Sequence, residues 1–197
     1  LNLESSLLSR NGFIGFFHDF LRQAVEKRYL ATRKEQTQVH TRLADYFMRI
    51  SKNQLRIVEE LPWQLEKAEQ WERLYYLLAD ISFFQLLYQH NRYDLMTYWT
   101  SIETNSNFRR IDAYSQVSKN PERVPLWVLD ALGIFYKETG NLDEGMKLYK
   151  AKERICRSSN DLRELSRSLN NQANILTDWG RHNEAIQLHK DSEFICR

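Results

Sequence analysis

Histidines, cysteines and neighbouring carboxylates are the side chains of this sequence that could do catalytic or metal chemistry. The five histidines include no pair at the i, i+4 spacing that puts two zinc ligands on one helical face beside a carboxylate. His182 and His189 are seven residues apart, too far for one zinc ion without further ligands. Glu59 and Glu60 diverge on a helix, and neither cysteine has a histidine close by for nucleophilic work. We therefore predict no catalytic site and no metal site.

The strongest pattern in the chain is an internal repeat between Leu126 and Arg197. In each copy, apolar residues at helical spacing precede and follow a glycine, which supplies the left-handed conformation that ends a helix. A fixed period of this length is typical of stacked helical hairpins, each too small to bury its own apolar stripe alone. The residues identical at an offset of forty are Leu129 and Leu169, Gly140 and Gly180, Glu144 and Glu184, Leu148 and Leu188, Lys150 and Lys190, Glu153 and Glu193, and Ile155-Cys156-Arg157 and Ile195-Cys196-Arg197.

These hairpins resemble the tetratricopeptide repeat, which has Leu-Gly or Leu-Ala, an aromatic residue three positions on, glycine at the turn, then alanine and an aromatic residue. The period of forty is similar to the long repeats of kinesin light chains and nephrocystin-type proteins. The resemblance implies an α-solenoid that continues beyond Arg197 and binds a protein or peptide. The matching residues are Leu132-Gly133, Tyr136, Gly140, Gly145 and Tyr149 in the first copy, and Ala173, Leu176, Gly180, Ala185 and His189 in the second, where Gln172 replaces leucine.

The same resemblance predicts a partner-binding face, because the first helix of each hairpin lines the concave side of such arrays. Ser168-Leu169-Asn170-Asn171 is similar to a stretch of kinesin-light-chain repeats whose asparagines bond the backbone of a bound peptide. An asparagine amide both donates and accepts, so it can pair with any peptide unit. The alternative is that these are ordinary polar surface residues. The predicted residues are Trp127, Asp130, Ala131, Ile134 and Lys137 in the first copy, and Arg167, Asn170, Asn171, Asn174 and Thr177 in the second.

A second resemblance lies near the start of the chain. Asn11-Gly12 between apolar runs predicts a β-hairpin, and a helix is expected from about Asp19 to Leu30. The hairpin and Phe17-His18-Asp19 resemble the end of the winged-helix domain of STAND NTPases, the NACHT and NB-ARC signalling ATPases. In that family the histidine contacts the phosphate of ADP, which implies the same role for His18. The alternative is that His18 merely ends a strand and Asp19 caps the helix.

No G-x-x-x-x-G-K-[ST] loop occurs in the sequence, so nothing in this chain would cradle nucleotide phosphates. We therefore expect no cofactor here, with ADP or ATP belonging to a longer parent protein of which this chain is a C-terminal part. The expected function is a non-catalytic sensor, whose bound partner shifts the parent's nucleotide switch. Oligomerisation of the parent on activation is a further expectation. The alternative is a stand-alone adaptor for a cargo or ciliary complex, and an enzyme is the least favoured class.

The predicted organisation is all-α, with residues 1–35 ending a winged-helix domain, 36–117 forming irregular helical hairpins, and 122–197 forming two repeats. Within the middle region, helices are expected from Trp71 to Tyr88 and from Tyr93 to Ile102. Pro62 should bend or restart the helix that contains it. The turn at Glu69-Gln70-Trp71 looks like a repeat turn that lacks its glycine.

Composition limits the remaining classes of partner. With 28 basic and 26 acidic residues the net charge is +2, which offers no strong field for nucleic acid or an anionic membrane. There is no apolar run of membrane-spanning length and no basic-then-apolar leader. Cys156 and Cys196 occupy equivalent repeat sites, beyond disulfide reach, so we expect buried thiols in a reducing, cytoplasmic setting.

Overall fold

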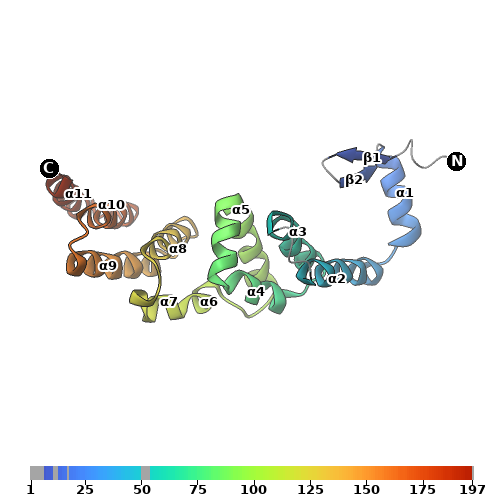
Figure 1. Cartoon of the computed structure of the whole chain (residues 1–197), viewed down its shortest axis with the longest axis horizontal. Helices are drawn as coiled ribbons and strands as arrows, with labels where there is room; N and C mark the ends of the chain where they lie inside the picture. The colour runs from blue at the N-terminus through green and yellow to red at the C-terminus, as the bar shows by residue number, and fades with distance from the viewer. Residues whose placement is uncertain (1–6, 11–12, 17, 50–53, 197) are drawn as a thin grey trace. The chain divides into compact units, whose positions relative to one another are not determined.

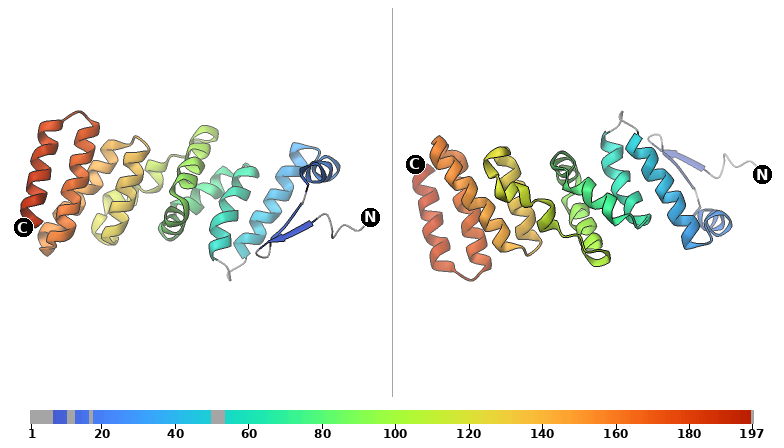
Figure 2. Two further views of the ribbon diagram at one scale, coloured as in Figure 1. Left: turned by 90° about the horizontal axis from the view of Figure 1, so that it is seen from above. Right: turned by 90° about the horizontal axis from the view of Figure 1, so that it is seen from below.

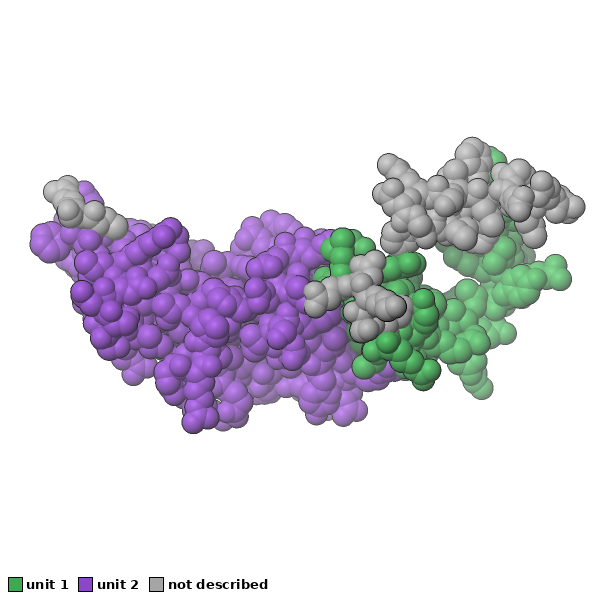
Figure 3. All heavy atoms as spheres, viewed as in Figure 1, with its two compact units in different colours: residues 1–71 green, residues 72–197 purple. Residues whose placement is uncertain are grey.

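The computed structural model describes residues 7–10, 13–16, 18–49 and 54–196, and most of these residues are helical (Figure 1). The chain divides into two compact units, residues 1–71 and residues 72–197, coloured separately in Figure 3. The boundary lies at the start of α4 (Trp71–Ala79), inside the region that the sequence assigns to irregular hairpins.

The first unit begins with two short antiparallel strands, β1 (Leu7–Arg10) and β2 (Phe13–Phe16), in which Leu7 lies opposite Phe16. The residues predicted to turn between them lie outside the described part of the chain. Helix α1 (Asp19–Tyr29) follows, and extended His18 precedes its first turn. Asp19 is the first helical residue and not its cap, and its carboxylate accepts hydrogen bonds from Arg22 and Gln23.

Helices α2 (Arg33–Arg49) and α3 (Gln54–Lys67) pack as a pair, joined by a 2.8 Å hydrogen bond between His40 and Gln64. Of the two outcomes predicted at Pro62, a bend or a restart of the helix, the restart does not occur, because α3 runs through this residue. Burial of Leu61 and Leu65 holds the helix together across the lost backbone hydrogen bond. Glu69 adopts a left-handed φ of 56°, which confirms the turn without glycine.

The second unit shows one helix break that the sequence prediction missed. The region predicted as one helix from Trp71 to Tyr88 is interrupted at Asp80, whose carboxylate accepts the backbone N–H of Phe83 at 2.8 Å and caps a new helix. A kink at Asn91 then separates the two halves of that helix, near the predicted gap. The elements of this region are α4, α5 (Ile81–Asn105), α6 (Arg110–Ala113), α7 (Ser115–Lys119) and the 3₁₀ turn η2 (Pro121–Arg123).

Aromatic side chains fill the core of this region instead of forming a groove. Trp99 is fully buried and donates its indole N–H to the hydroxyl of Tyr114, which donates in turn to the carbonyl of Leu78 at 2.7 Å. The rings of Phe84 and Phe135 lie 5.3 and 6.2 Å from that of Tyr114. The aromatic density of α5 is therefore packing, as expected for a helix buried in a stack.

The forty-residue repeat forms two helical hairpins that lie side by side (Figure 2). Gly140 and Gly180, with φ of 79° and 73°, occupy the two turns, which confirms the predicted left-handed conformation at both. Consecutive helices pack in the order α8, α9, α10, α11. Their bounds are α8 (Leu126–Glu138), α9 (Leu142–Ser159), α10 (Leu162–Asp178) and α11 (His182–Cys196).

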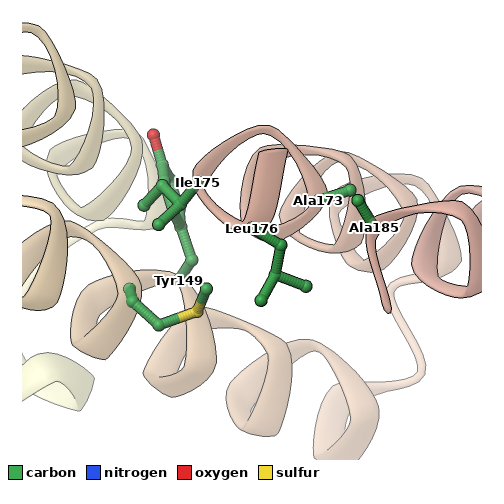
Figure 4. Close-up of a cluster of buried hydrophobic side chains, with 6 residues drawn as sticks. Tyr149, Ala173, Ile175, Leu176 and Ala185 are labelled. Atoms are coloured by element: carbon green, nitrogen blue, oxygen red, sulfur yellow. The ribbon is translucent and has the colours of Figure 1, made fainter. Parts of the chain in front are cut away.

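Between the hairpins, buried side chains from α9, α10 and α11 form one apolar cluster (Figure 4). Cys156 belongs to a second cluster and is a free, buried thiol whose pKa is raised by burial, in agreement with the expected filler role. The side chain of Cys196 lies outside the described part of the chain. The first cluster contains Met146, Tyr149, Ala173, Ile175, Leu176 and Ala185.

Candidate partner-binding face

The predicted partner-binding residues lie on α8 and α10, the first helices of the two hairpins. On α8, Trp127 is 38% exposed, and Asp130, Ile134 and Lys137 are half-buried. Ala131 is buried, so it is not available on this face and the prediction for that residue was wrong. We call the accessible set the α8–α10 face. On α10 it comprises Arg167, Asn174 and Thr177, which are exposed, and Asn170 and Asn171, which are half-buried.

A buried ammonium group joins three of these residues. The side chain of Lys152, on α9, is 0% exposed, and its Nζ donates to Glu164 Oε2 at 2.6 Å and to Asp130 Oδ2. Asn171 donates weakly to the other Asp130 oxygen at 3.5 Å, and Arg167 donates to Glu164 at 2.6 Å. This network, which we call the Lys152 cluster, therefore ties α8, α9 and α10 together beneath the α8–α10 face.

The two carboxylates of the cluster respond differently to their surroundings. Burial raises the pKa of the Asp130 carboxyl even though Lys152 donates a hydrogen bond to it. The hydrogen bond from Lys152 lowers the pKa of Glu164, which is less desolvated. One ammonium thus serves two carboxylates, and its loss would leave two negative groups facing each other at low solvation.

Sequence reasoning did not single out Lys152 or Glu164, although a signal for the lysine was present. Lys152 falls on the apolar side of α9, with Tyr149 and Cys156 three and four residues away, where an ammonium group needs partners. The equivalent residue forty positions later is Ser192, also buried, which bonds Ser166 at 2.7 Å. Both copies therefore place a buried, hydrogen-bonded polar side chain at the same position of the second helix.

Other contacts hold the neighbouring side chains of the face. Lys137 pairs with Asp178 at 3.2 Å, which links α8 to α10, and Asn170 pairs with His189 at 2.9 Å. Asn174 makes no hydrogen bond within the part of the chain that the structure describes, so its amide is free to pair with another molecule. The face therefore combines positioned charges with a free amide and an exposed indole.

The remaining candidates do not form a chemical site. Within the described ranges, no three histidine, cysteine or acidic side chains gather to hold a metal ion. His18 is exposed and stacks on Phe20 with ring centroids 5.2 Å apart, and its role as a nucleotide sensor stays a prediction. His182 and His189 are exposed on α11. None of the described helices is both long enough and apolar enough to cross a bilayer.

Comparison with known proteins gives one relative. Over 102 residues, which are 51% of this chain, the sequence is 39% identical to a TPR repeat-containing protein of Dictyostelium discoideum. The chain spans only 6% of the length of that protein. No protein-family model matches the chain, and no solved structure matches it significantly. The relative and the two stacked hairpins together support a helical-repeat region of the tetratricopeptide type.

Proposed function

We propose that this helical-repeat region binds a partner protein by holding an extended segment of it on the α8–α10 face. The observation that carries the proposal is the Lys152 cluster. It connects Asp130 to Asn171, 41 residues later, and so positions side chains from two hairpins on one surface. A surface assembled in this way is preorganised, which lowers the entropic cost of binding.

The chemistry of the face suits a peptide backbone. The free Asn174 amide can donate to a peptide carbonyl and accept from a peptide N–H, whatever the side chains of the partner. Trp127 offers a flat apolar surface of the kind enriched in protein interfaces. Charged side chains of the face are already paired within the chain, so they add specificity at the rim and little net affinity.

The test uses peptides selected from a random library for binding to the full chain, with affinity measured by fluorescence polarisation. Replacing Asn171 and Asn174 together with alanine should weaken binding about fivefold to twentyfold, since a hydrogen bond to the ligand contributes about 1 kcal/mol. Asn183→Ala is the matched control, because Asn183 is an exposed asparagine on α11 that does not belong to the α8–α10 face. Equal affinities for the double variant and the wild type would exclude this face as the binding site.

The second part of the proposal places the repeats in a longer STAND-type signalling protein. Occupation of the α8–α10 face would favour an open state, and His18 would favour the closed, ADP-bound state. The support is the sequence Phe17-His18-Asp19 followed by α1, together with the exposure of His18, which leaves it accessible to a ligand.

The test of this second part is nucleotide retention by the longer protein. His18→Ala should accelerate release of bound ADP by about tenfold, as expected when one charge-assisted hydrogen bond to phosphate is lost. Asp19→Ala is a control for damage to α1, because Asp19 bonds only Arg22 and Gln23 of its own helix among the contacts described. Unchanged ADP release in His18→Ala would remove the sensor role and leave peptide binding intact.

A further inference from the structure

A row of basic side chains lies on the outer side of α9, away from the α8–α10 face. Lys147, Lys150 and Arg154 are all exposed, and their spacing of three and four residues places them on one side of the helix. Lys119, at the end of α7, lines the same hollow as Arg154 from the opposite side, since α7 and η2 pack against α9. We call these four residues the basic shelf.

The shelf borders two adjoining hollows rather than a flat surface. One, of about 410 Å³, lies between η2 and α9, and the other, of about 600 Å³, extends along α9. Ser118, Ala151 and Arg154 line both hollows, so the two adjoin each other. Ala151 is buried at its base, and the half-buried Ile155 and Pro121 add apolar surface at the η2 end.

The charges of the shelf are only partly balanced within the chain. Lys147 pairs with Glu144 at 2.5 Å, whereas Lys119, Lys150 and Arg154 make no ion pair within the described ranges. The charge of Lys150 helps to lower the pKa of the Glu184 carboxyl, so it is balanced in part, and Lys119 and Arg154 carry most of the excess. Of the two acidic residues that line the hollows, Glu153 is engaged by Arg157 and by Gln172, and Glu122 is exposed beside η2. A net charge of only +2 for the whole chain makes this local excess a feature of the shelf and not of the composition.

The second repeat does not reproduce the shelf. At an offset of forty, Gln187 stands in place of Lys147 and Phe194 in place of Arg154, while Lys190 matches Lys150. Lys150 recurs in the second copy but Lys147 and Arg154 do not, so stacking of the hairpins does not require those two basic side chains. The first copy thus carries a charge pattern that the fold does not demand.

We propose that the basic shelf binds an acidic segment of a partner protein, rich in Asp and Glu and ending in an apolar residue that enters the hollow beside Pro121 and Ile155. From Lys147 to Arg154 the helix rises about 10 Å. This matches about three residues of an extended chain at 3.3 Å per residue, so alternate carboxylates fall within reach of successive cations. The shelf has no aromatic side chain on which a base could stack, which favours an acidic peptide over a nucleic acid.

The experiment measures fluorescence anisotropy of a labelled ten-residue peptide of alternating Glu and Ser that ends in Leu. The full chain should bind it at low salt and lose affinity as salt is raised. Lys150→Glu with Arg154→Glu should weaken binding at least about tenfold, the loss expected when two attractive charges become repulsive. Arg163→Glu with Lys190→Glu makes the same change in net charge at exposed sites outside the shelf and should leave binding within about twofold.

Three outcomes would overturn the proposal: no binding by the wild type, equal loss in the two charge-reversed variants, or tighter binding of a single-stranded oligonucleotide of equal charge. Substitution of Asn171 and Asn174 by alanine should leave binding of the acidic peptide unchanged. Failure of the shelf is therefore separable from failure of the α8–α10 face. Circular dichroism melting of each variant checks that its helices are intact.

Discussion

Replacement of Lys152 by methionine should lower the free energy of unfolding of the second unit by about 3–5 kcal/mol, the range for breaking a buried ion pair by removing one partner. Methionine keeps the length of the lysine stem, so little cavity forms. The cost arises because Asp130 and Glu164, with side chains only 23% and 19% exposed, lose the ammonium that both contact. Urea denaturation of the full chain, followed by circular dichroism, gives the change.

The control for this prediction neutralises the carboxylates as well. Lys152→Met combined with Asp130→Asn and Glu164→Gln should recover most of the lost stability, because no charge then remains without its partner. A loss of less than about 1 kcal/mol in the free energy of unfolding of the single variant is typical of surface ion pairs. That result would show that the Lys152 cluster is solvated and contributes little to stability.

The pH dependence of the same variant follows from the two carboxyl pKa values. The pKa of Glu164 is lowered in the fold, so its contribution is complete above the unfolded value, about 4.3, and is lost as the pH falls through the lowered value. The raised pKa of Asp130 acts in the opposite direction, since its burial costs stability only where the carboxyl is ionised. Removing Lys152 raises both values. The stability difference should therefore be largest near pH 7 and shrink below about pH 5.

Local rules predicted the turns of this fold better than its helix ends. Gly140 and Gly180 were predictable because a left-handed φ strongly favours glycine, and both positions have it. The break at Asp80 was missed because the apolar spacing continues across it. An aspartate immediately before an apolar run is nevertheless a helix N-cap signal, and Asp80 accepts the backbone N–H of Phe83. At Pro62 the opposite error occurred, because a restart was among the predicted outcomes and the helix continues. Burial of the neighbouring leucines outweighs the backbone hydrogen bond that proline removes.

The candidate face was predictable as a set of exposed positions but not as a network. Helical period alone assigns Asp130 and Asn171 to the same side of successive hairpins. Their connection runs through Lys152, and a lysine is placed on the surface by default. The position of Lys152 on the apolar side of α9 indicated burial, but the packing of α9 between α8 and α10 is needed to show which carboxylates its ammonium group contacts.

The tight packing of Gly133 against Tyr149 leads to the second large expected effect. A Cβ atom at Gly133 would lie 2.6 Å from two ring atoms of Tyr149, and Tyr149 is buried under α10. Gly133→Val should therefore lower the free energy of unfolding by about 3 kcal/mol, the upper part of the usual range for overpacking. Valine is a better helix former than glycine by less than about 1 kcal/mol, which offsets only part of this cost.

The second repeat indicates how this strain can be relieved. There Ala173 occupies the site of Gly133, and His189 occupies the site of Tyr149, so the larger residue on the first helix accompanies the smaller ring on the second. In a Tyr149→His background, Gly133→Val should cost about 1–2 kcal/mol less than in the wild type, measured as the coupling energy of a double-mutant cycle. Strictly additive effects would show that α8 and α9 separate freely, and would contradict the close packing of Gly133 against Tyr149 as the determinant of their spacing.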